Sequence, residues 1–171
     1  MEKKDLKPAG VFKYFEEICQ VPRPSKKEEK MIAYLKAFGA KHNLETKVDE
    51  AGNVLIKKPA TPGKENLQTV VLQSHIDMVC EKNNDVQHDF LTDPIETEID
   101  GEWLKAKGTT LGADNGIGVA TELAILADDS IEHGPLECLF TVDEETGLTG
   151  AFALKEGFMS GDILLNLDPE D

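Results

Sequence analysis

Three short apolar runs, separated by longer helical patterns, constrain the fold of this chain more than any other feature. The runs cover residues 67–73, 136–142 and 163–167. A run of this length between turn residues is typical of a strand that is buried on both faces. Buried strands that alternate with helices predict an α/β fold, with a mixed, mostly parallel sheet and helices on both faces.

The other elements are predicted from periodicity and turn residues. Ser25 and Glu28 form a capping-box pattern, so a helix with an apolar stripe from Met31 to Phe38 is expected to begin there. Asp100-Gly101 interrupts an alternating segment and favours a hairpin. The remaining predictions are helices over residues 8–19 and 116–127, strands over 45–49 and 53–58, and the hairpin over 95–106.

The composition is that of an ordinary globular chain with an acidic excess. Of 171 residues, 40% are hydrophobic, and no apolar stretch approaches the roughly 18 residues of a membrane span. The 33 acidic and 18 basic residues give a net charge of -15, which argues against a nucleic-acid partner. Residues 1–8 have no apolar core after their charges, so we expect a cytoplasmic protein without a secretory signal. The 3 cysteines are widely spaced and indicate reduced thiols.

Polar clusters follow the predicted strands, and open α/β sheets bind their ligands at strand ends. In the first cluster, Ser74-His75-Ile76-Asp77, the imidazole and the carboxylate point to the same side if the strand continues. A metal-binding histidine usually gives its other ring proton to a carboxylate, so His75 fits a ligand and Asp77 its orienting group. A His–Asp pair with a purely structural role is the alternative.

Two further clusters combine carboxylates with glycines. Asp114 lies within Gly112–Gly116, where a helix is expected to begin, and the glycines allow a tight turn that exposes it. The helix dipole favours the same aspartate as an N-cap, which is the structural alternative. Asp143-Glu144-Glu145 follows an apolar strand, and three successive carboxylates repel one another unless a cation lies between them. An acidic surface turn is the alternative there.

The fourth cluster, Asn166-Leu167-Asp168, ends the last apolar run and by itself indicates only a turn. Together, the four clusters provide one histidine and several carboxylates at successive strand ends. Such a mixed shell suits Zn²⁺, Co²⁺ or Mn²⁺, and one carboxylate can bridge two ions about 3.5–4 Å apart. A non-catalytic acidic binding domain is the competing interpretation.

Four motifs follow one another in a recognisable order and spacing: SHIDMVCEKN, LGADNGIGVA, TVDEETGLTGA and LLNLDPED. From about residue 8 onward the chain resembles the bacterial aminoacyl-histidine dipeptidases, also called Xaa-His dipeptidases. These enzymes belong to the co-catalytic metallopeptidases, with glutamate carboxypeptidase and acetylornithine deacetylase. The motifs around His75 and Glu144-Glu145 are specific for this larger group, whereas Met78–Asn83 and the Gly-Ala-Asp-Asn-Gly stretch indicate the dipeptidase branch.

The resemblance implies a set of metal ligands. In this set Asp114 would bridge two ions, with His75 and Asp168 on the first ion and Glu145 on the second. The family also implies a cis peptide bond after the bridging aspartate. The cofactor implied is a pair of Zn²⁺ ions, with Co²⁺ or Mn²⁺ as alternatives.

The resemblance also implies an activity. The expected reaction is hydrolysis of dipeptides, Xaa-His dipeptides in particular, by a water activated between two metal ions. Glu144 would be the general base, and Asp77 would orient the histidine ligand. A related N-acyl amino acid deacetylase or tripeptidase would use the same chemistry, so these activities stay open as alternatives.

Family members are longer and have a lid domain inserted in the catalytic domain. We therefore expect residues 1–171 to be the N-terminal part of a catalytic domain, inactive alone, without the lid and the C-terminal part. The family has one more ligand, a late histidine, and none of His42, His88 and His133 lies in a matching motif. The full-length protein is expected to bind dipeptides and to form a homodimer through its lid.

Overall fold

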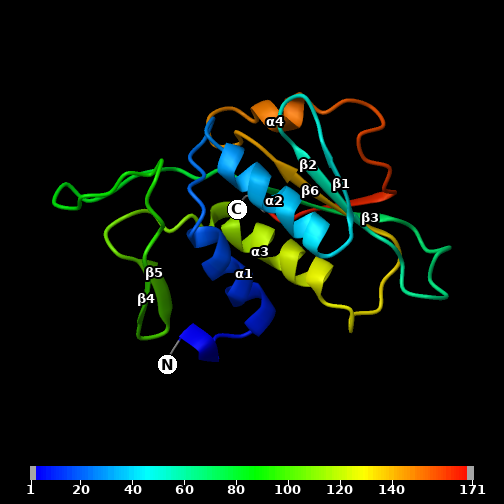
Figure 1. Ribbon diagram of the computed structural model, residues 1–171, viewed down its shortest axis with the longest axis horizontal. Coiled ribbons are helices and arrows are strands. Elements are labelled where there is room, and N and C mark those ends of the chain that lie inside the picture. The colour runs from blue at the N-terminus through cyan, green and yellow to red at the C-terminus, as the bar shows by residue number, and fades with distance from the viewer. Residues whose placement is uncertain (1–2, 169–171) are drawn as a thin grey trace.

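A computed structural model describes residues 3–168 of the chain (Figure 1). Met1, Glu2 and residues 169–171, which end the fourth sequence motif, lie outside the described part. The described chain forms a 5-stranded sheet, a separate 2-stranded sheet and the helices around them. In chain order the elements are η1 (Lys3–Asp5), α1 (Ala9–Cys19), α2 (Glu29–Lys41), β1 (Glu45–Val48), β2 (Val54–Lys58), β3 (Val70–His75), β4 (Thr97–Asp100), β5 (Trp103–Ala106), α3 (Ala113–Ala127), β6 (Leu136–Thr141), α4 (Thr149–Phe152) and β7 (Ile163–Asn166).

The large sheet has the strand order β1-β2-β6-β3-β7. β2 pairs antiparallel with β1 and β6, whereas β3 pairs parallel with β6 and β7. All strands of this sheet except β2 therefore run in one direction, and the predicted mixed, mostly parallel α/β fold is confirmed. The carboxyl ends of β6, β3 and β7 lie side by side, so the motifs that follow these strands meet at one end of the sheet.

Helices α1, α2 and α3 lie together over one face of the large sheet (Figure 1). Their apolar side chains and alternate strand residues form one continuous buried cluster. Its fully buried members include Phe15, Ile18, Met31, Leu35, Ile56, Leu123 and Phe140. Within residues 3–168, no helix is both long and apolar enough to cross a membrane.

The opposite face of the sheet carries a smaller apolar cluster. Leu55, Val71 and Leu139 are buried there, and the segment after α4 packs on them through residues such as Leu154 and Phe158. These strand residues alternate with those that face the helices, as expected for buried strands. Burial on both faces explains why β3 and β6 could be predicted from apolar runs.

The predicted capping box at the start of α2 is wrong. Glu28 stands at the N-cap position, but no side-chain hydrogen bond caps the helix there. Ser25 instead donates to Asp77, and Glu28 accepts the backbone N–H of Asp143. Tertiary partners have replaced the local ones, so both side chains support the loops that carry the sequence motifs.

Candidate metal centre

His75, the last residue of β3, forms the centre of the site. Its side chain is only 1% exposed, and Nδ1 lies 3.3 Å from Oδ1 of Asp77. Nδ1 also lies 3.2 Å from the carbonyl oxygen of the same aspartate. Because Nδ1 faces Asp77, Nε2 is the ring nitrogen that faces the other proposed ligands.

Carboxylates from three separate segments surround Nε2 of His75. Oδ1 of Asp114 lies 3.1 Å away, and both Oε2 of Glu144 and Oδ2 of Asp168 lie 3.8 Å away. Ligand atoms of His75, Asp114 and Glu145 lie within 4.8 Å of one another, as do those of His75, Glu144 and Asp168. With Asp77 at Nδ1, the five other side chains selected from the sequence therefore all lie around the imidazole of His75.

The strand register explains this convergence. His75 is paired with Thr141 across β3 and β6, so the carboxylates that follow β6 emerge beside the imidazole. On the other side, Gln73 is paired with Asn166 across β3 and β7. Asp168 is two residues beyond that pair, which brings it level with His75.

Asp77 is buried and fixed from several directions. Ser25 Oγ donates to its Oδ2 at 2.7 Å, and the backbone N–H groups of Glu144 and Glu145 donate to it at 3.0 Å and 3.2 Å. Burial by itself raises the pKa of Asp77, but hydrogen bonds from His75, Glu144 and Ser25 outweigh burial and lower it to about 2. An ionised Asp77 thus links the histidine to the loop that bears the two glutamates.

Glu28 and Asp143 also fix the loop that bears the two glutamates. Together with Asp77 they form a group of three buried carboxylates. Glu28 Oε1 accepts the backbone N–H of Asp143 at 2.9 Å, and Asp143 Oδ1 accepts the hydroxyl of Thr146 at 2.5 Å. N–H and O–H donors therefore offset much of the repulsion between these carboxylates.

The sequence left open whether Asp114 caps α3 or faces a metal ion. The structure assigns these two positions to two different residues at the start of α3. The peptide bond between Asp114 and Asn115 is cis, as the resemblance implied, and both residues have non-helical φ and ψ angles. Asn115 Oδ1 accepts the N–H of Gly118 at 3.0 Å and so caps the regular part of the helix. Its Nδ2 donates to the carbonyl of Leu167 at 3.1 Å. Asn115 thus makes the capping bond, whereas the 75% exposed side chain of Asp114 faces His75.

The imidazole of His75 and the carboxylates around it form a set of ligand atoms that fits a divalent cation. Burial raises the pKa of Glu144 and Glu145; His75 opposes this rise, and neighbouring carboxylates add to it. Burial lowers the pKa of His75, but hydrogen bonds to Asp77 and Asp114 outweigh this and raise it to about 9. A proton on the imidazole thus compensates the surrounding carboxylates, and a divalent cation could replace that proton. One imidazole nitrogen with several carboxylates suits Zn²⁺, Co²⁺ or Mn²⁺.

Arg23 was not among the residues selected from the sequence, although it lies close to the site. The guanidinium is buried and donates to the carbonyl oxygens of Ile76, Asp77 and Gly112. One signal could have found it, because Arg23 is the only arginine in the sequence.

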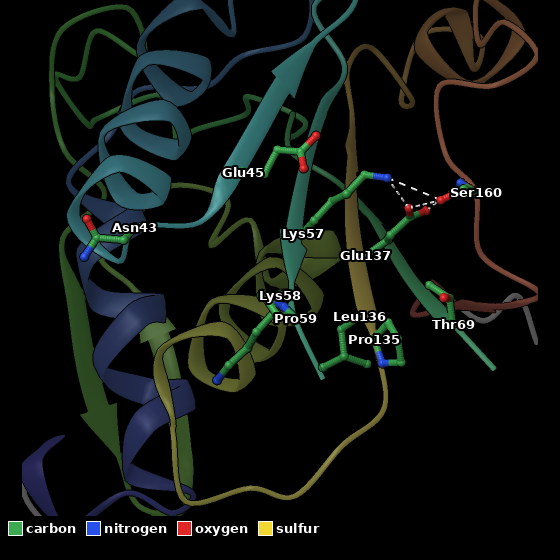
Figure 2. A pocket seen from close by; sticks show the side chains of 10 residues that line it. All are labelled: Asn43, Glu45, Lys57, Lys58, Pro59, Thr69, Pro135, Leu136, Glu137 and Ser160. Carbon is green, nitrogen blue, oxygen red and sulfur yellow. Dashed lines mark hydrogen bonds and ion pairs between the residues drawn. The ribbon is translucent and has the colours of Figure 1, made fainter. Parts of the chain in front are cut away.

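A separate hollow of about 440 Å³ lies at the other end of the strands, near the starts of β3 and β6 (Figure 2). Its lining includes an ion pair, in which Lys57 Nζ lies 2.6 Å from Oε1 of Glu137. No residue of the candidate centre lines this hollow.

Fold and site together define a class: an α/β domain whose parallel strand ends carry the histidine and carboxylates typical of co-catalytic metallopeptidases. Comparison with known families agrees with this class. The chain belongs to peptidase family M20/M25/M40, which matches residues 71–168.

Individual relatives support the dipeptidase branch that the motifs indicated. The cytosol non-specific dipeptidase of Escherichia coli (strain K12) is 51% identical over 170 residues, which cover 99% of this chain and 35% of that protein. The crystal structure of aminoacylhistidine dipeptidase from Vibrio alginolyticus matches with a TM-score of 0.96 at 55% identity, again over 99% and 35% of the two chains. An aminopeptidase PepT from Bacillus cereus ATCC 10987 matches with a TM-score of 0.79 at 26% identity, over 95% of this chain and 43% of that one. The chain thus spans about a third of the length of the first two relatives.

Proposed function

We propose that the chain carries most of the metal centre of a dipeptidase and that the full-length protein hydrolyses dipeptides. The observation that carries this proposal is the arrangement around His75, where Asp77 faces Nδ1 and carboxylates from three segments face or adjoin Nε2. The identity of 51% to a dipeptidase over 99% of the chain supports the same reaction.

The proposed cofactor is a pair of Zn²⁺ ions, with Co²⁺ or Mn²⁺ as alternatives. His75 and Asp168 would hold one ion, Glu145 the other, and Asp114 both. When bound, the ions would polarise the scissile carbonyl and lower the pKa of a water molecule towards about 7. Zinc usually has four ligands, so we propose that the rest of the protein supplies a further ligand, such as a late histidine, to the second ion.

Glu144 is the proposed general base. Its carboxylate lies beside the ligand atoms of His75 and Asp168 and is 27% exposed, so it can reach both the site and a substrate. Its raised pKa brings it closer to neutral pH, where a base both accepts and returns protons efficiently. The carboxylate would take a proton from water and pass it to the leaving amine, while Asp77 keeps the proton of His75 on Nδ1.

The remaining proposals concern the full-length protein. We propose that residues 1–171 are the N-terminal part of its catalytic domain. A lid and a C-terminal part, both outside these 171 residues, would complete the full-length protein. The relatives are about three times as long, which supports this division. We also propose Xaa-His dipeptides among its substrates, a cytoplasmic location and a homodimer; the name of the E. coli relative supports the location.

Glu144→Gln in the full-length protein tests the reaction. Loss of the base should lower kcat for dipeptides by about 10²–10⁴-fold while bound metal stays at the wild-type level. The substrates assayed should include β-alanyl-histidine, other dipeptides, a tripeptide and an acetyl amino acid. Glu156→Gln, at an exposed position, is the matched control and should keep wild-type activity. Near-normal turnover in Glu144→Gln would exclude this residue as the base, and hydrolysis of acetyl amino acids alone would favour a deacetylase.

Asp114→Ala tests the bridging role. Removal of a shared ligand should lower the metal content per chain below that of the wild-type protein, as measured by elemental analysis. Asp85→Ala removes an exposed carboxylate elsewhere and should leave the content unchanged. An unaltered metal count in Asp114→Ala would contradict the proposal that this aspartate bridges two ions.

A further inference from the structure

Arg23 is an unusual residue in this chain. It is the only arginine in a sequence whose other basic residues are lysines, and it is 2% exposed. A buried cation is costly unless hydrogen bonds replace its hydration. The hydrogen bonds of this guanidinium must therefore offset the free-energy cost of its burial.

The guanidinium connects two segments that carry the metal centre. Nη1 donates to the carbonyl oxygens of Ile76 at 3.0 Å and Asp77 at 3.1 Å, directly after His75. Nη2 donates to the carbonyl oxygen of Gly112 at 2.5 Å, two residues before Asp114. The planar guanidinium makes these bonds from two nitrogens held in a fixed geometry, whereas a lysine would have to make them all from one nitrogen at the end of a flexible chain.

Two glycines make room for this connection. A Cβ atom added at Gly112 or at Gly116 would lie 2.6 Å from Nη2 of Arg23. Gly112 also has a φ of +68°, which side chains rarely adopt. The glycines on both sides of Asp114 therefore serve the packing of the guanidinium as well as the turn.

The backbone around Arg23 is tied to the same place. The carbonyl oxygen of Arg23 accepts the N–H of Met78 at 3.2 Å, and Pro24 forms an isolated parallel bridge with Met78. The next residue, Ser25, donates to Asp77. Residues 23–25 thus brace the segment after β3 from one side, while the guanidinium extends across to the start of α3.

We propose that Arg23 is a positioning residue of the metal centre: it fixes the segment of His75 and Asp77 relative to that of Asp114 and thereby sets the affinity for the metal. This role rests on the proposed function. It predicts that exchange of Arg23 weakens metal binding even though the residue contacts none of the proposed ligand atoms.

The test is Arg23→Lys in the full-length protein, which keeps the charge but loses the planar guanidinium. The Kd for Zn²⁺, measured by competition with a chelator, should rise about 10–100-fold, the usual effect of losing a group that orients ligands. The visible absorption spectrum of the Co²⁺-loaded protein should change as well, since it reports the geometry of the ligands.

Lys58→Met is the matched control. Lys58 is also a buried cation that donates to backbone carbonyls, those of Ile125 at 3.2 Å and Asp128 at 2.8 Å, at the far end of α3. Its loss should lower the melting temperature but leave the Kd for Zn²⁺ and the Co²⁺ spectrum at wild-type values. A general loss of stability is thereby distinguished from a loss of positioning.

Gly116→Ala is the second variant, should Arg23→Lys fail to fold. It keeps the arginine but forces the guanidinium to move, so the same weakening of metal binding is expected. If the folded variant keeps the wild-type Kd and Co²⁺ spectrum, the positioning role of Arg23 is overturned but the proposed function is not. A wild-type protein that binds no metal would overturn the proposed function and, with it, this role.

Discussion

Glu122 lies in the middle of α3, and the residue is completely buried, with 0% of its surface exposed. Ser74 Oγ donates to its Oε1 at 2.7 Å. Burial raises the pKa of Glu122 well above its usual value, although hydrogen bonds with Ser74 and Cys138 oppose the rise. The group is therefore expected to stay protonated in the folded chain.

This burial predicts a dependence of stability on pH. Above about pH 4.5 the unfolded chain releases the proton of Glu122 while the folded chain keeps it, so the free energy of unfolding falls as pH rises. The slope contributed by one such group reaches about 1.4 kcal/mol per pH unit. In Glu122→Gln this contribution should disappear, as urea unfolding from pH 4 to pH 8 would measure. Glu156→Gln, at an exposed position, should keep the wild-type slope. If Glu122→Gln also kept the wild-type slope, the carboxyl of Glu122 in the wild-type chain would ionise normally.

At this scale the sequence predicts the residues whose chemistry a motif displays and misses those whose role depends on burial. His75 and Asp114 could be selected because their neighbours in the chain form a recognisable pattern. Glu122 lies in a run of apolar helix residues, and nothing in the sequence shows that Ser74 faces it. Ser25 was assigned to a helix cap because a local partner is visible in the sequence, whereas Asp77, its partner in the structure, lies 52 residues away.

Among the elements, β6 anchors the segment that covers the second face of the sheet. Glu137 of β6 is 2% exposed and accepts hydrogen bonds from Lys57 of β2 at 2.6 Å and from the hydroxyl of Ser160 at 2.6 Å, as Figure 2 shows. Its other oxygen accepts the backbone N–H groups of Ser160 at 2.8 Å and Gly161 at 3.1 Å. One carboxylate therefore joins two strands to the chain that leads into β7.

Glu137→Ala should release this segment. The lost acceptor leaves several donors unpaired, so the free energy of unfolding should fall by about 1–3 kcal/mol in urea denaturation. Limited proteolysis should then cut within residues 153–161 at lower protease concentrations than in the wild-type chain. Glu45→Ala provides the control, because Glu45 lines the same hollow but its side chain is 58% exposed. Equal proteolysis of the three proteins would show that Glu137 does not anchor the segment.

The elements themselves were largely predictable, and the pairing of strands was not. Strands 45–49 and 53–58 and the hairpin within 95–106 have turn residues beside them, so their observed bounds differ little from the prediction. β3 begins at Val70, later than the predicted 67, because its ladder with β6 starts at the pair of Val70 and Leu136. A single sequence does not show where a distant partner begins, nor that β6 is inserted between β2 and β3.

For the molecule as a whole, the most unusual feature is the exposed outer strand β7. Its apolar residues Ile163, Leu164 and Leu165 are 39%, 50% and 48% exposed, although strands of parallel sheets are normally covered on both faces. In the described part of the chain, β7 is the last strand of the sheet and is paired with β3 on one side only. In relatives about three times as long, ample chain exists to cover such a strand.

Hydrogen exchange can test whether the rest of the protein completes this sheet. In a parallel sheet, the N–H groups of a strand bond alternately to its two neighbours, so about half of those in β7 lack a strand partner among residues 3–168. These amides should exchange quickly in this chain and slowly in the full-length protein, where an added strand and covering helices would protect them. Amides in the β2–β6 ladder should be protected in both proteins and serve as the internal reference. Equally fast exchange of these β7 amides in the full-length protein would mean that no strand pairs with β7 on its open side, and the division of the catalytic domain proposed for residues 1–171 would then be wrong.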